Sequence, residues 1–507
     1  MAPYSNDTQI QGASISKALH KPIYHITIPP RRPSLSAQCS CARNLPLELI
    51  SQVDSYFEKL VGLYFEHLYS AFPILEERCL SAGLNDKLMV SRTLLVNFIA
   101  YVLFYWNLGP ELMLHAKADQ DFAWQVAVQS LTADVQKGNI AIVISIVLNV
   151  AGRPSKGFVS NMTSVARAVA LSHSCGLNHD CREWKLTELE KKLRWKAWWA
   201  VLIHDRWLNF AQGTPPYVSK AHYDVPLPTI ELLASDRISI LKHYKAAECY
   251  IELCRLTEII GDILPLIHHI RSSNDNLAAD QISRSETELD EWCHSRPKWI
   301  DYNTFDNRPE IPGLANLQLS YLATRMLLQR LSWHEASRNQ LHSQSHLGPC
   351  LTTAENVVHL AASLASHDLD GFWLPYTASH FTSAVTLLLR CSLQTNDPTI
   401  RHRGMESARS LVSTLRRHKH ESNWDMADTA LAQSETVLKR VEDAIVHHPV
   451  PVPVSVTETE TDPRMSSTLD SPVFYYPDSS WQGNLEELFP EIFSSFNTES
   501  MLFDSYT

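Results

Sequence analysis

Three histidines, and the aspartates beside two of them, are the residues of this chain whose types could hold a metal ion. They are His173 and the pairs His179–Asp180 and His204–Asp205. Imidazole and carboxylate groups bind divalent metals and activate water, so the set could serve a helical metal-dependent phosphohydrolase. However, His204 and Asp205 are adjacent on one predicted helix, where their side chains point about 100° apart. A partly buried Asp205 that pairs with a basic side chain from a neighbouring helix is the simpler interpretation.

The remaining chemical motifs are weaker. His179 and Asp180 directly follow a predicted helix cap at Gly176, where aspartate is a common turn residue. Residues 152–157 read Gly-Arg-Pro-Ser-Lys-Gly but lack the GxxxxGK[ST] spacing that turns successive N–H groups onto a phosphate. We therefore expect a loop between helices there, and no catalytic residue anywhere in the chain.

Two basic clusters could bind phosphate groups, but each has a simpler explanation. The first opens a predicted helix, where cations oppose the helix dipole, so we expect a solvated face with a carboxylate partner nearby. The second ends a helix, where cations are favoured. The clusters are Lys191, Lys192, Arg194 and Lys196, and then Arg416, Arg417, His418, Lys419 and His420.

Composition favours an all-α protein. Only 15 of the 507 residues are glycine, so phosphate loops and tight β-turns are scarce. The net charge of −11 argues against a surface that coats nucleic acid. The ten cysteines are scattered, which is typical of buried thiols in a reducing compartment. The apolar runs 94–106 and 140–150 are shorter than the roughly 20 residues that span a bilayer, so we predict core helices and no membrane contact.

The residues around 204 are positioned by one long predicted helix. Thr187 and Glu190 form a capping box at its start, and Gly213 with Pro215 ends it. Every residue from 197 to 203 is apolar, so this stretch must be enclosed by other helices. We expect a structural hub consisting of Trp198, Trp199, Asp205, Arg206, Trp207, Gly213 and Pro215.

Further amphipathic segments predict a large multi-helix body over residues 46–446. A second capping box is expected at Thr352 and Glu355. Pro73 should stop an aromatic helix, with Phe72 and Ile74 tucked into the core. The predicted helices cover residues 161–175, 240–260, 280–295, 317–333, 355–364, 379–393, 405–417 and 426–446.

Several of these motifs together resemble the middle homology region of fungal-specific transcription factors. They are Gly-Leu-Asn at 176–178, a basic run into Trp198–Trp199, Asp205–Arg206 and Gly-Thr-Pro-Pro at 213–216, with an aromatic entry motif at 64–75. The sequences of residues 177–184 and 204–208 further resemble those of the subgroup that co-activates nitrogen-catabolism genes. The resemblance covers about residues 50–445. It implies a helical regulatory domain in a nuclear regulator of RNA polymerase II genes, possible targets being nitrogen or secondary metabolism.

The amino-terminal segment departs from that family. Members usually carry a zinc binuclear cluster, in which six thiolates within about 30 residues hold two metals. Residues 1–45 are polar, rich in proline and serine, and predicted to be disordered; they offer only Cys39 and Cys41. We expect no cofactor in this chain. Either a zinc cluster lies upstream of Met1, or a partner regulator supplies the DNA contact.

The carboxy-terminal segment, residues 447–507, is predicted to be a proline-rich linker and an acidic-aromatic activation tail. Acidic residues alternate with large apolar ones, which is typical of activation domains. A nascent helix there would dock into a coactivator groove through Leu485, Leu488, Phe489, Ile492 and Phe493. Folding of this tail back onto the body as a capping helix is the alternative.

The sequence thus predicts a transcription regulator that acts by recruitment. Its expected partners are other regulators, coactivators, a second copy of the chain or a small inducer between helices. Two alternatives stay open. An enzyme would lose turnover on His179→Ala or His204→Ala, whereas a pure scaffold would bind partners without activating transcription.

Overall fold

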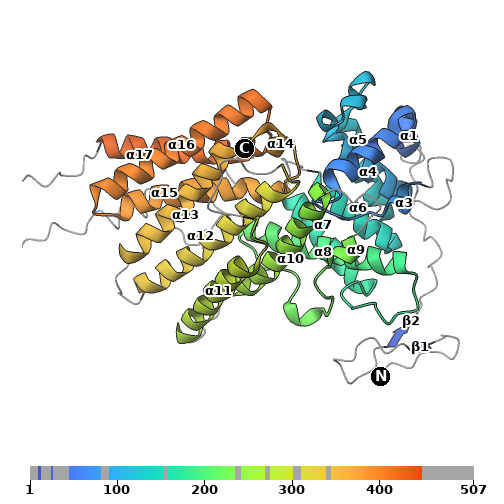
Figure 1. Ribbon diagram of the computed structural model, residues 1–507, viewed down its shortest axis with the longest axis horizontal. Helices are drawn as coiled ribbons and strands as arrows, with labels where there is room; N and C mark the ends of the chain where they lie inside the picture. The colour runs from blue at the N-terminus through green and yellow to red at the C-terminus, as the bar shows by residue number, and fades with distance from the viewer. Residues whose placement is uncertain are drawn as a thin grey trace, which may run out of the picture.

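The computed structural model describes residues 10–12, 24–26, 45–81, 91–152, 158–233, 241–268, 275–300, 310–338 and 344–447. Within these ranges the protein is helical, as predicted, apart from one pair of short strands (Figure 1). Strands β1 (Ile10–Gly12) and β2 (Tyr24–Ile26) pair in antiparallel fashion. They lie in the segment predicted to be disordered, and no pattern in the sequence indicated them.

The first helices form one end of the molecule. Helix α4 packs against both α5 and α6, and the Asn149 amide donates to Asn97 Oδ1 at 3.0 Å between α6 and α4. Phe72 and Ile74 are buried after the aromatic helix, as predicted at Pro73. The elements are α1 (Leu45–Val53), η2 (Asp54–Tyr56), α2 (Phe57–Leu63), the π-helix η3 (Tyr64–Leu68), α3 (Glu77–Ser81), α4 (Arg92–Leu103), η4 (Trp106–Leu108), η5 (Pro110–Leu114), α5 (Gln120–Asp134), η6 (Val135–Lys137) and α6 (Ile140–Ala151).

The middle of the chain holds the long helices that carry the hub. Helix α8 packs against α6, α7 and α10, so neighbours enclose it on several sides. Figure 1 shows α7, α8 and α10 between the first helices and the last ones. The elements are α7 (Phe158–Ser174), α8 (Glu188–Gln212), η7 (Lys220–His222), α9 (Ile230–Leu233), α10 (Leu241–Ile267) and α11 (Asp275–Ser295).

The last helices form the opposite end. Helix α15 packs against α13, α16 and α17. The capping box predicted at Thr352 and Glu355 is wrong, because α13 already begins at Gln344 and runs through Pro349. The elements are α12 (Leu314–Arg338), α13 (Gln344–Ser363), α14 (Ser366–Leu369), η8 (Pro375–Thr377), α15 (Ala378–Gln394), α16 (Pro398–Ser422) and α17 (Met426–His447).

Two hydrophobic cores fill the body, and α12 belongs to both. Leu328 of α12 lies in the first core, which extends from α1 to α12, whereas Leu319 lies in the second, which extends from α12 to α17. The chain between α14 and α15 also enters both, since Phe372 and Tyr376 join the first core and Trp373 the second. The sequence predicted one body and did not reveal this division.

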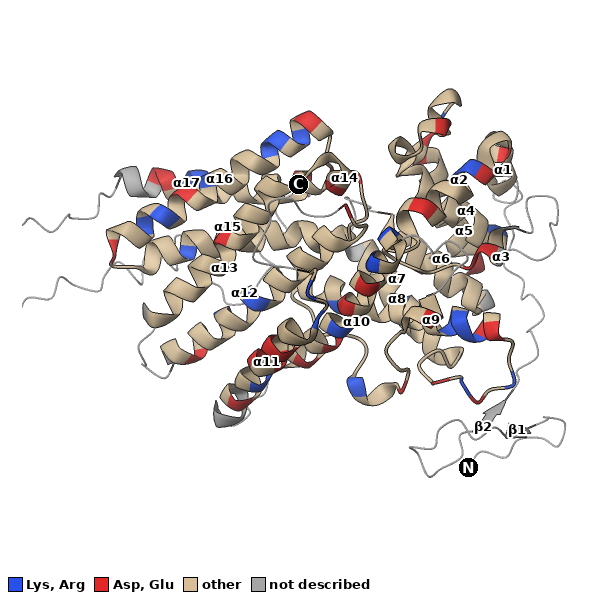
Figure 2. Cartoon of the chain, in the orientation of Figure 1, with Lys and Arg blue, Asp and Glu red and all other residues tan. Residues whose placement is uncertain are grey.

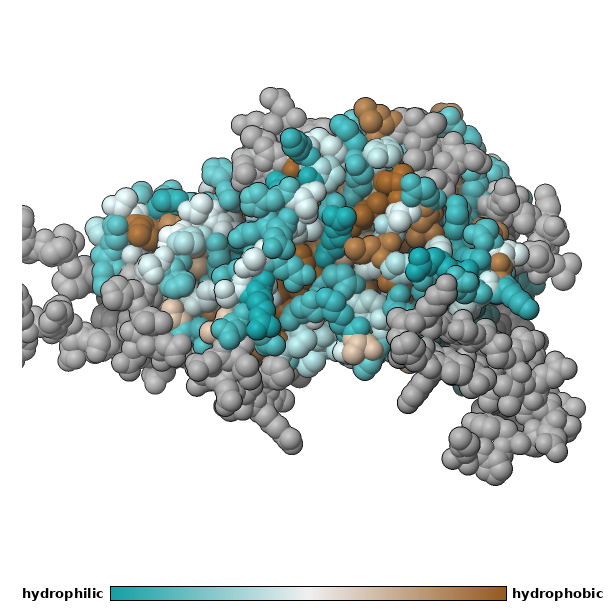
Figure 3. Space-filling view, turned by 60° about the horizontal axis from the view of Figure 1, so that its bottom comes forward, coloured by the Kyte–Doolittle hydropathy of each residue, from teal (hydrophilic) through white to brown (hydrophobic). Residues whose placement is uncertain are grey.

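Charged residues lie mainly on the outer helices. Figure 2 shows acidic residues concentrated along α11, and the face in Figure 3 is mostly hydrophilic, with a gathering of hydrophobic residues in its right half. In the part of the chain that is described, no helix is both long and apolar enough to cross a membrane. The eight cysteines in that part are free thiols, five of them buried.

Candidate functional site

Helix α8 begins and ends where local chemistry dictates. Glu190 donates its backbone N–H to Thr187 Oγ1 at 3.3 Å, and the Thr187 N–H donates to Glu190 Oε2 at 3.0 Å, which confirms the capping box. Gly213 ends the helix in the left-handed region, with φ of 65°, where a residue with a Cβ would be strained. The predicted boundaries of the central helix are therefore correct.

The tryptophans of α8 fix it to its surroundings. Residues 197–203 are all buried, as predicted. Trp199 donates from Nε1 to the Pro226 carbonyl at 2.8 Å, which ties the returning loop to the helix. Trp207 donates from Nε1 to Thr257 Oγ1 of α10, also at 2.8 Å. The indoles of Trp199 and Trp207 thus combine apolar burial with a satisfied polar atom, a combination that holds a helix in one position.

The Asp205 carboxylate holds the loop that follows α8. It accepts hydrogen bonds from the backbone N–H groups of Tyr217 and Val218, at 2.8 and 3.1 Å, and from the Asn209 amide at 2.9 Å. Asp205 is fully buried, and the predicted basic partner from a neighbouring helix is wrong, because these donors occupy the carboxylate. Burial raises the pKa of Asp205 to about 6, while the two backbone donors act in the opposite direction.

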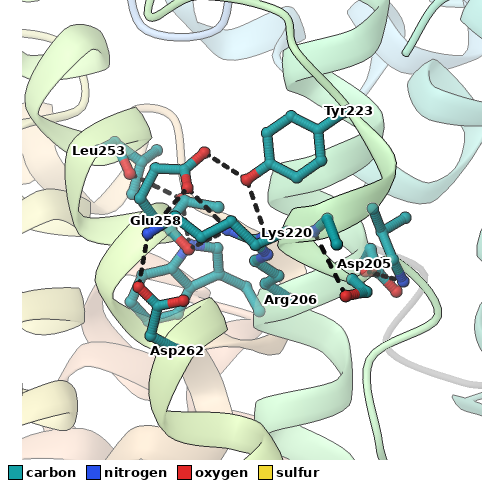
Figure 4. Close-up of polar contacts among 12 residues, drawn as sticks. Asp205, Arg206, Lys220, Tyr223, Leu253, Glu258 and Asp262 are labelled. Atoms are coloured by element: carbon teal, nitrogen blue, oxygen red, sulfur yellow. Dashed lines mark hydrogen bonds and ion pairs between the residues drawn. The ribbon is translucent and has the colours of Figure 1, made fainter. Parts of the chain in front are cut away.

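Arg206 points the other way, towards α10 (Figure 4). Its guanidinium donates to the Thr257 carbonyl at 2.9 Å and to the Tyr223 hydroxyl at 3.0 Å. Tyr223 in turn donates to Glu258 Oε1 at 2.6 Å, and Glu258 lies 3.7 Å from Arg206. Arg206 is buried, so this charge is stable only because hydrogen bonds and a carboxylate compensate for its lost hydration.

A glycine makes room for this arginine. A Cβ built on Gly261 of α10 would lie 2.3 Å from Arg206 Cζ, far inside contact distance. No local pattern in the sequence indicated this pairing, because the two residues lie 55 positions apart. Lys220 completes the group at its exposed edge, with Nζ 2.6 Å from Asp262 Oδ2 and 3.9 Å from Glu258.

The turn after α8 is held by these contacts rather than by its prolines. Thr214 donates from its backbone to the Asn209 carbonyl at 3.0 Å and from its hydroxyl to Asn209 Oδ1 at 2.6 Å. Pro215 is exposed, so its contribution is to stop the helix. The predicted hub residues thus divide into buried anchors on α8 and two turn residues after it, the half-buried Gly213 and the exposed Pro215.

The candidate metal ligands do not come together. His204 is buried, its Nδ1 lies 2.6 Å from the Tyr376 hydroxyl, and burial lowers its pKa to about 3. His179 Nδ1 lies 3.6 Å from Asp224, and Asp180 pairs with Arg182. Across the described ranges, no group of three or more His, Cys, Asp or Glu residues could hold a metal ion. His173 instead lies beside the Trp198 ring, with centroids 5.9 Å apart.

One member of the first basic cluster differs from the prediction of a solvated face. Lys196 is buried, and its ammonium donates to Glu76 and to the Tyr69 hydroxyl. The carboxylate partner that we expected nearby is present for Lys191, whose Nζ lies 3.0 Å from Glu188, whereas the partner of the buried Lys196 lies 120 residues away.

Four members of the second cluster are exposed as predicted, and Arg416 Nη2 lies 2.7 Å from Glu435. The prediction is wrong for His418, which is buried with its Nε2 2.8 Å from the Ala361 carbonyl.

Some predicted sites cannot be placed. Cys39, Cys41, residues 153–157 and the tail anchors Leu485, Leu488, Phe489, Ile492 and Phe493 lie outside the described residues. What the described residues assemble around α8 is a buried polar clamp that fixes one helix, one loop and α10 relative to each other.

Comparison with known proteins identifies the class of this protein. Residues 61–294 match the family described as fungal specific transcription factor domain, and this match covers α8, its loop, α10 and the hub. Residues 61–294 therefore form a fungal specific transcription factor domain. The relatives of the chain bear this out, since they too are fungal transcription regulators.

An uncharacterized transcriptional regulatory protein of Schizosaccharomyces pombe is 26% identical over 75% of this chain and 57% of its own length. The transcriptional activator protein DAL81 of Saccharomyces cerevisiae is 24% identical over 54% of this chain and 32% of its own length. Cutinase transcription factor 1 alpha of Fusarium vanettenii is 23% identical over 32% of this chain and 18% of its own length. The chain thus spans between about a fifth and somewhat over half of these relatives.

Proposed function

We propose that this protein activates or co-activates transcription in the nucleus, with the helical body as a platform and residues 447–507 as the activating segment. The observation that carries the proposal is the family match over residues 61–294, which contains the whole clamp around Asp205 and Arg206. The relative named as a transcriptional activator supports the activating direction. The composition of the tail supports its role, because acidic and aromatic residues alternate there.

In this proposal DNA is contacted by a zinc binuclear cluster outside residues 1–507 or on a partner regulator. Cys39 and Cys41 are two thiolates, and a binuclear cluster needs six. Zinc therefore belongs to that other module. The partners of the body are other regulators or a second copy of this chain. The sequence of residues 177–184 favours the subgroup that co-activates nitrogen-catabolism genes.

A DNA-tethered reporter tests the proposal. The full chain, fused to a heterologous DNA-binding module, should activate the reporter, and the same fusion ending at residue 446 should not. Far-ultraviolet circular dichroism of the shortened protein should still show the helical body. Leu488→Ala combined with Phe489→Ala should lower activation within the full chain, because these residues are the central anchors of the nascent helix. Equal activation with and without residues 447–507 would show that the activating surface lies elsewhere.

A second candidate, metal-dependent hydrolysis, finds no support in the geometry. His204 is bound to Tyr376 inside the core, and His179 lies beside Asp224. The two histidines therefore serve different local contacts. A transcription regulator needs neither as a ligand.

A further inference from the structure

The segment between α14 and α15 places successive side chains in different cores. Phe372 and Leu374 are buried in the first core, whereas Trp373, which stands between them, is buried in the second. Tyr376 follows in η8 and joins the first core again. The backbone of Leu374 is extended, with φ of −70° and ψ of 133°, and side chains of an extended chain point alternately to opposite sides. Residues 372–376, which we call the strap, therefore lie between the two cores and fill a place in each.

On the side of the first core the strap contacts residues of the family-matched domain. The Phe372 ring stacks on Phe72, with centroids 5.2 Å apart and an angle of 16° between the rings. The Tyr376 hydroxyl lies 2.6 Å from His204 Nδ1, and Phe72 meets the His204 ring edge-on at 5.4 Å. Phe72 and His204 both belong to residues 61–294.

On the side of the second core the strap contacts the turn that starts the last helix. Trp373 donates from Nε1 to the Asp368 carbonyl at 2.7 Å, and its ring packs against Trp424 with centroids 5.5 Å apart. Trp424 lies between α16 and α17, and its N–H donates to the His418 carbonyl at 3.3 Å. Helix α17 begins two residues later, at Met426. The strap thus joins the family-matched domain to the base of α17.

Alternation of side chains prevents the strap from shifting gradually. A slip by one residue would turn Trp373 towards the first core, and Phe372 and Leu374 towards the second. Both interiors are close-packed, so neither has room for a side chain of another shape. The Leu374 N–H would also lose Asn316 Oδ1 of α12, to which it donates at 2.9 Å. The strap is therefore either seated in both cores or withdrawn from both.

We propose that the strap is a conformational device that makes the two cores loosen together. A partner that displaces Phe72 or His204 in residues 61–294 withdraws the strap and loosens the turn at Trp424. The coupling is reciprocal, so a change at Trp424 reaches His204 by the same route. The consequence for the activating segment after α17 rests on the proposed function, whereas the coupling between the cores does not.

Amide hydrogen exchange of the full chain, followed by mass spectrometry, tests this coupling. Phe372→Ala should speed exchange in residues 422–430 by about tenfold or more, although Phe372 belongs to the first core. Phe57→Ala is the matched control, because Phe57 has the same exposure of 3% in the first core and its ring faces Phe98 rather than the strap. This control should speed exchange in α2 and α4 and leave residues 422–430 within about twofold of the natural protein.

Two further variants keep the test decisive if Phe372→Ala does not fold. Tyr376→Phe keeps the buried ring and loses only the hydroxyl beside His204, so it should accelerate exchange in residues 422–430 more weakly than Phe372→Ala. Trp424→Leu tests the opposite direction and should speed exchange in residues 200–207 of α8. Unchanged exchange at 422–430 in the strap variants, an unchanged α8 in Trp424→Leu, or equal acceleration in Phe57→Ala would overturn the proposal.

Discussion

Asp205 stabilises the protein by holding two backbone donors that lie 12 and 13 residues further along the chain. Removing the carboxylate leaves these N–H groups without an acceptor, and each such group costs about 1–3 kcal/mol. We predict that Asp205→Ala lowers the free energy of unfolding by about 2–4 kcal/mol, measured by urea denaturation. Asp428→Ala is the matched control, because its exposed pair with Lys419 contributes under about 1 kcal/mol. Equal losses in both variants would show that the clamp does not hold the loop.

His204 predicts a dependence of stability on pH. Its pKa is about 3 in the folded protein, below the ordinary 6.5. Below pH 6.5 the unfolded chain therefore takes up a proton that the folded protein does not, and the stability from this group is lost as the pH falls towards 3. Between pH 7 and 5 we expect His204→Phe to reduce the loss of unfolding free energy by about 2 kcal/mol.

Urea denaturation at both pH values measures this effect. His359→Phe serves as a comparison on a histidine outside the first core. The prediction fails if the His204 variant loses as much stability between pH 7 and 5 as the natural protein. Loss of the hydrogen bond to Tyr376 lowers the unfolding free energy of the variant equally at pH 7 and pH 5, so it leaves the difference between the two pH values unaffected.

At the scale of the element, α8 and α10 are locked by the contact between Arg206 and Gly261. Gly261→Ala brings a Cβ to 2.3 Å from Arg206 Cζ. The guanidinium cannot move away without losing its hydrogen bonds to the Thr257 carbonyl and the Tyr223 hydroxyl. We predict a loss of about 1–3 kcal/mol in unfolding free energy. Gly62→Ala in α2 is the control, because nothing lies within 4 Å of its added Cβ and alanine favours a helix by about 1 kcal/mol. Opposite signs for the two substitutions are the expected result, and a gain for both would contradict the close contact.

How far the elements could be predicted depends on whether their signals are local. Both ends of α8 are determined by residues close in sequence, namely the Thr187–Glu190 capping box and Gly213, and the predicted boundaries are correct there. The start of α13 was misplaced, because Thr352 and Glu355 imitate a capping box inside a helix that begins eight residues earlier. Packing, which the local sequence does not contain, decides such cases.

In the candidate site, even fewer contacts could be predicted from local sequence patterns. Burial of Trp198 and Trp199 followed from an apolar run, but the partners of the charged residues did not follow from any pattern. Glu76 reaches Lys196 from 120 residues away, and the donors to the Asp205 carboxylate are backbone N–H groups of a loop rather than a basic side chain. Pairings between distant segments are set by the three-dimensional arrangement alone.

For the whole molecule, α12 couples the two cores. Leu328→Ala removes a side chain from the first core and Leu319→Ala one from the second, each at a cost of about 2–5 kcal/mol. Because both lie on one helix, we predict that either substitution speeds amide hydrogen exchange in α6 and in α15. Exchange measured by mass spectrometry would contradict this coupling if Leu319→Ala affected α15 alone and Leu328→Ala affected α6 alone.

If the helical body regulates transcription without metal chemistry at His179, activation should not depend on that side chain. The most direct measurement is reporter transcription driven by the full chain tethered to DNA, compared at equal nuclear level with the His179→Ala variant. We predict clear activation by the full chain and the same activation by His179→Ala, because His179 lies in a local turn beside Asn178 and Asp224. No activation by the full chain, or its loss in His179→Ala, would contradict the account.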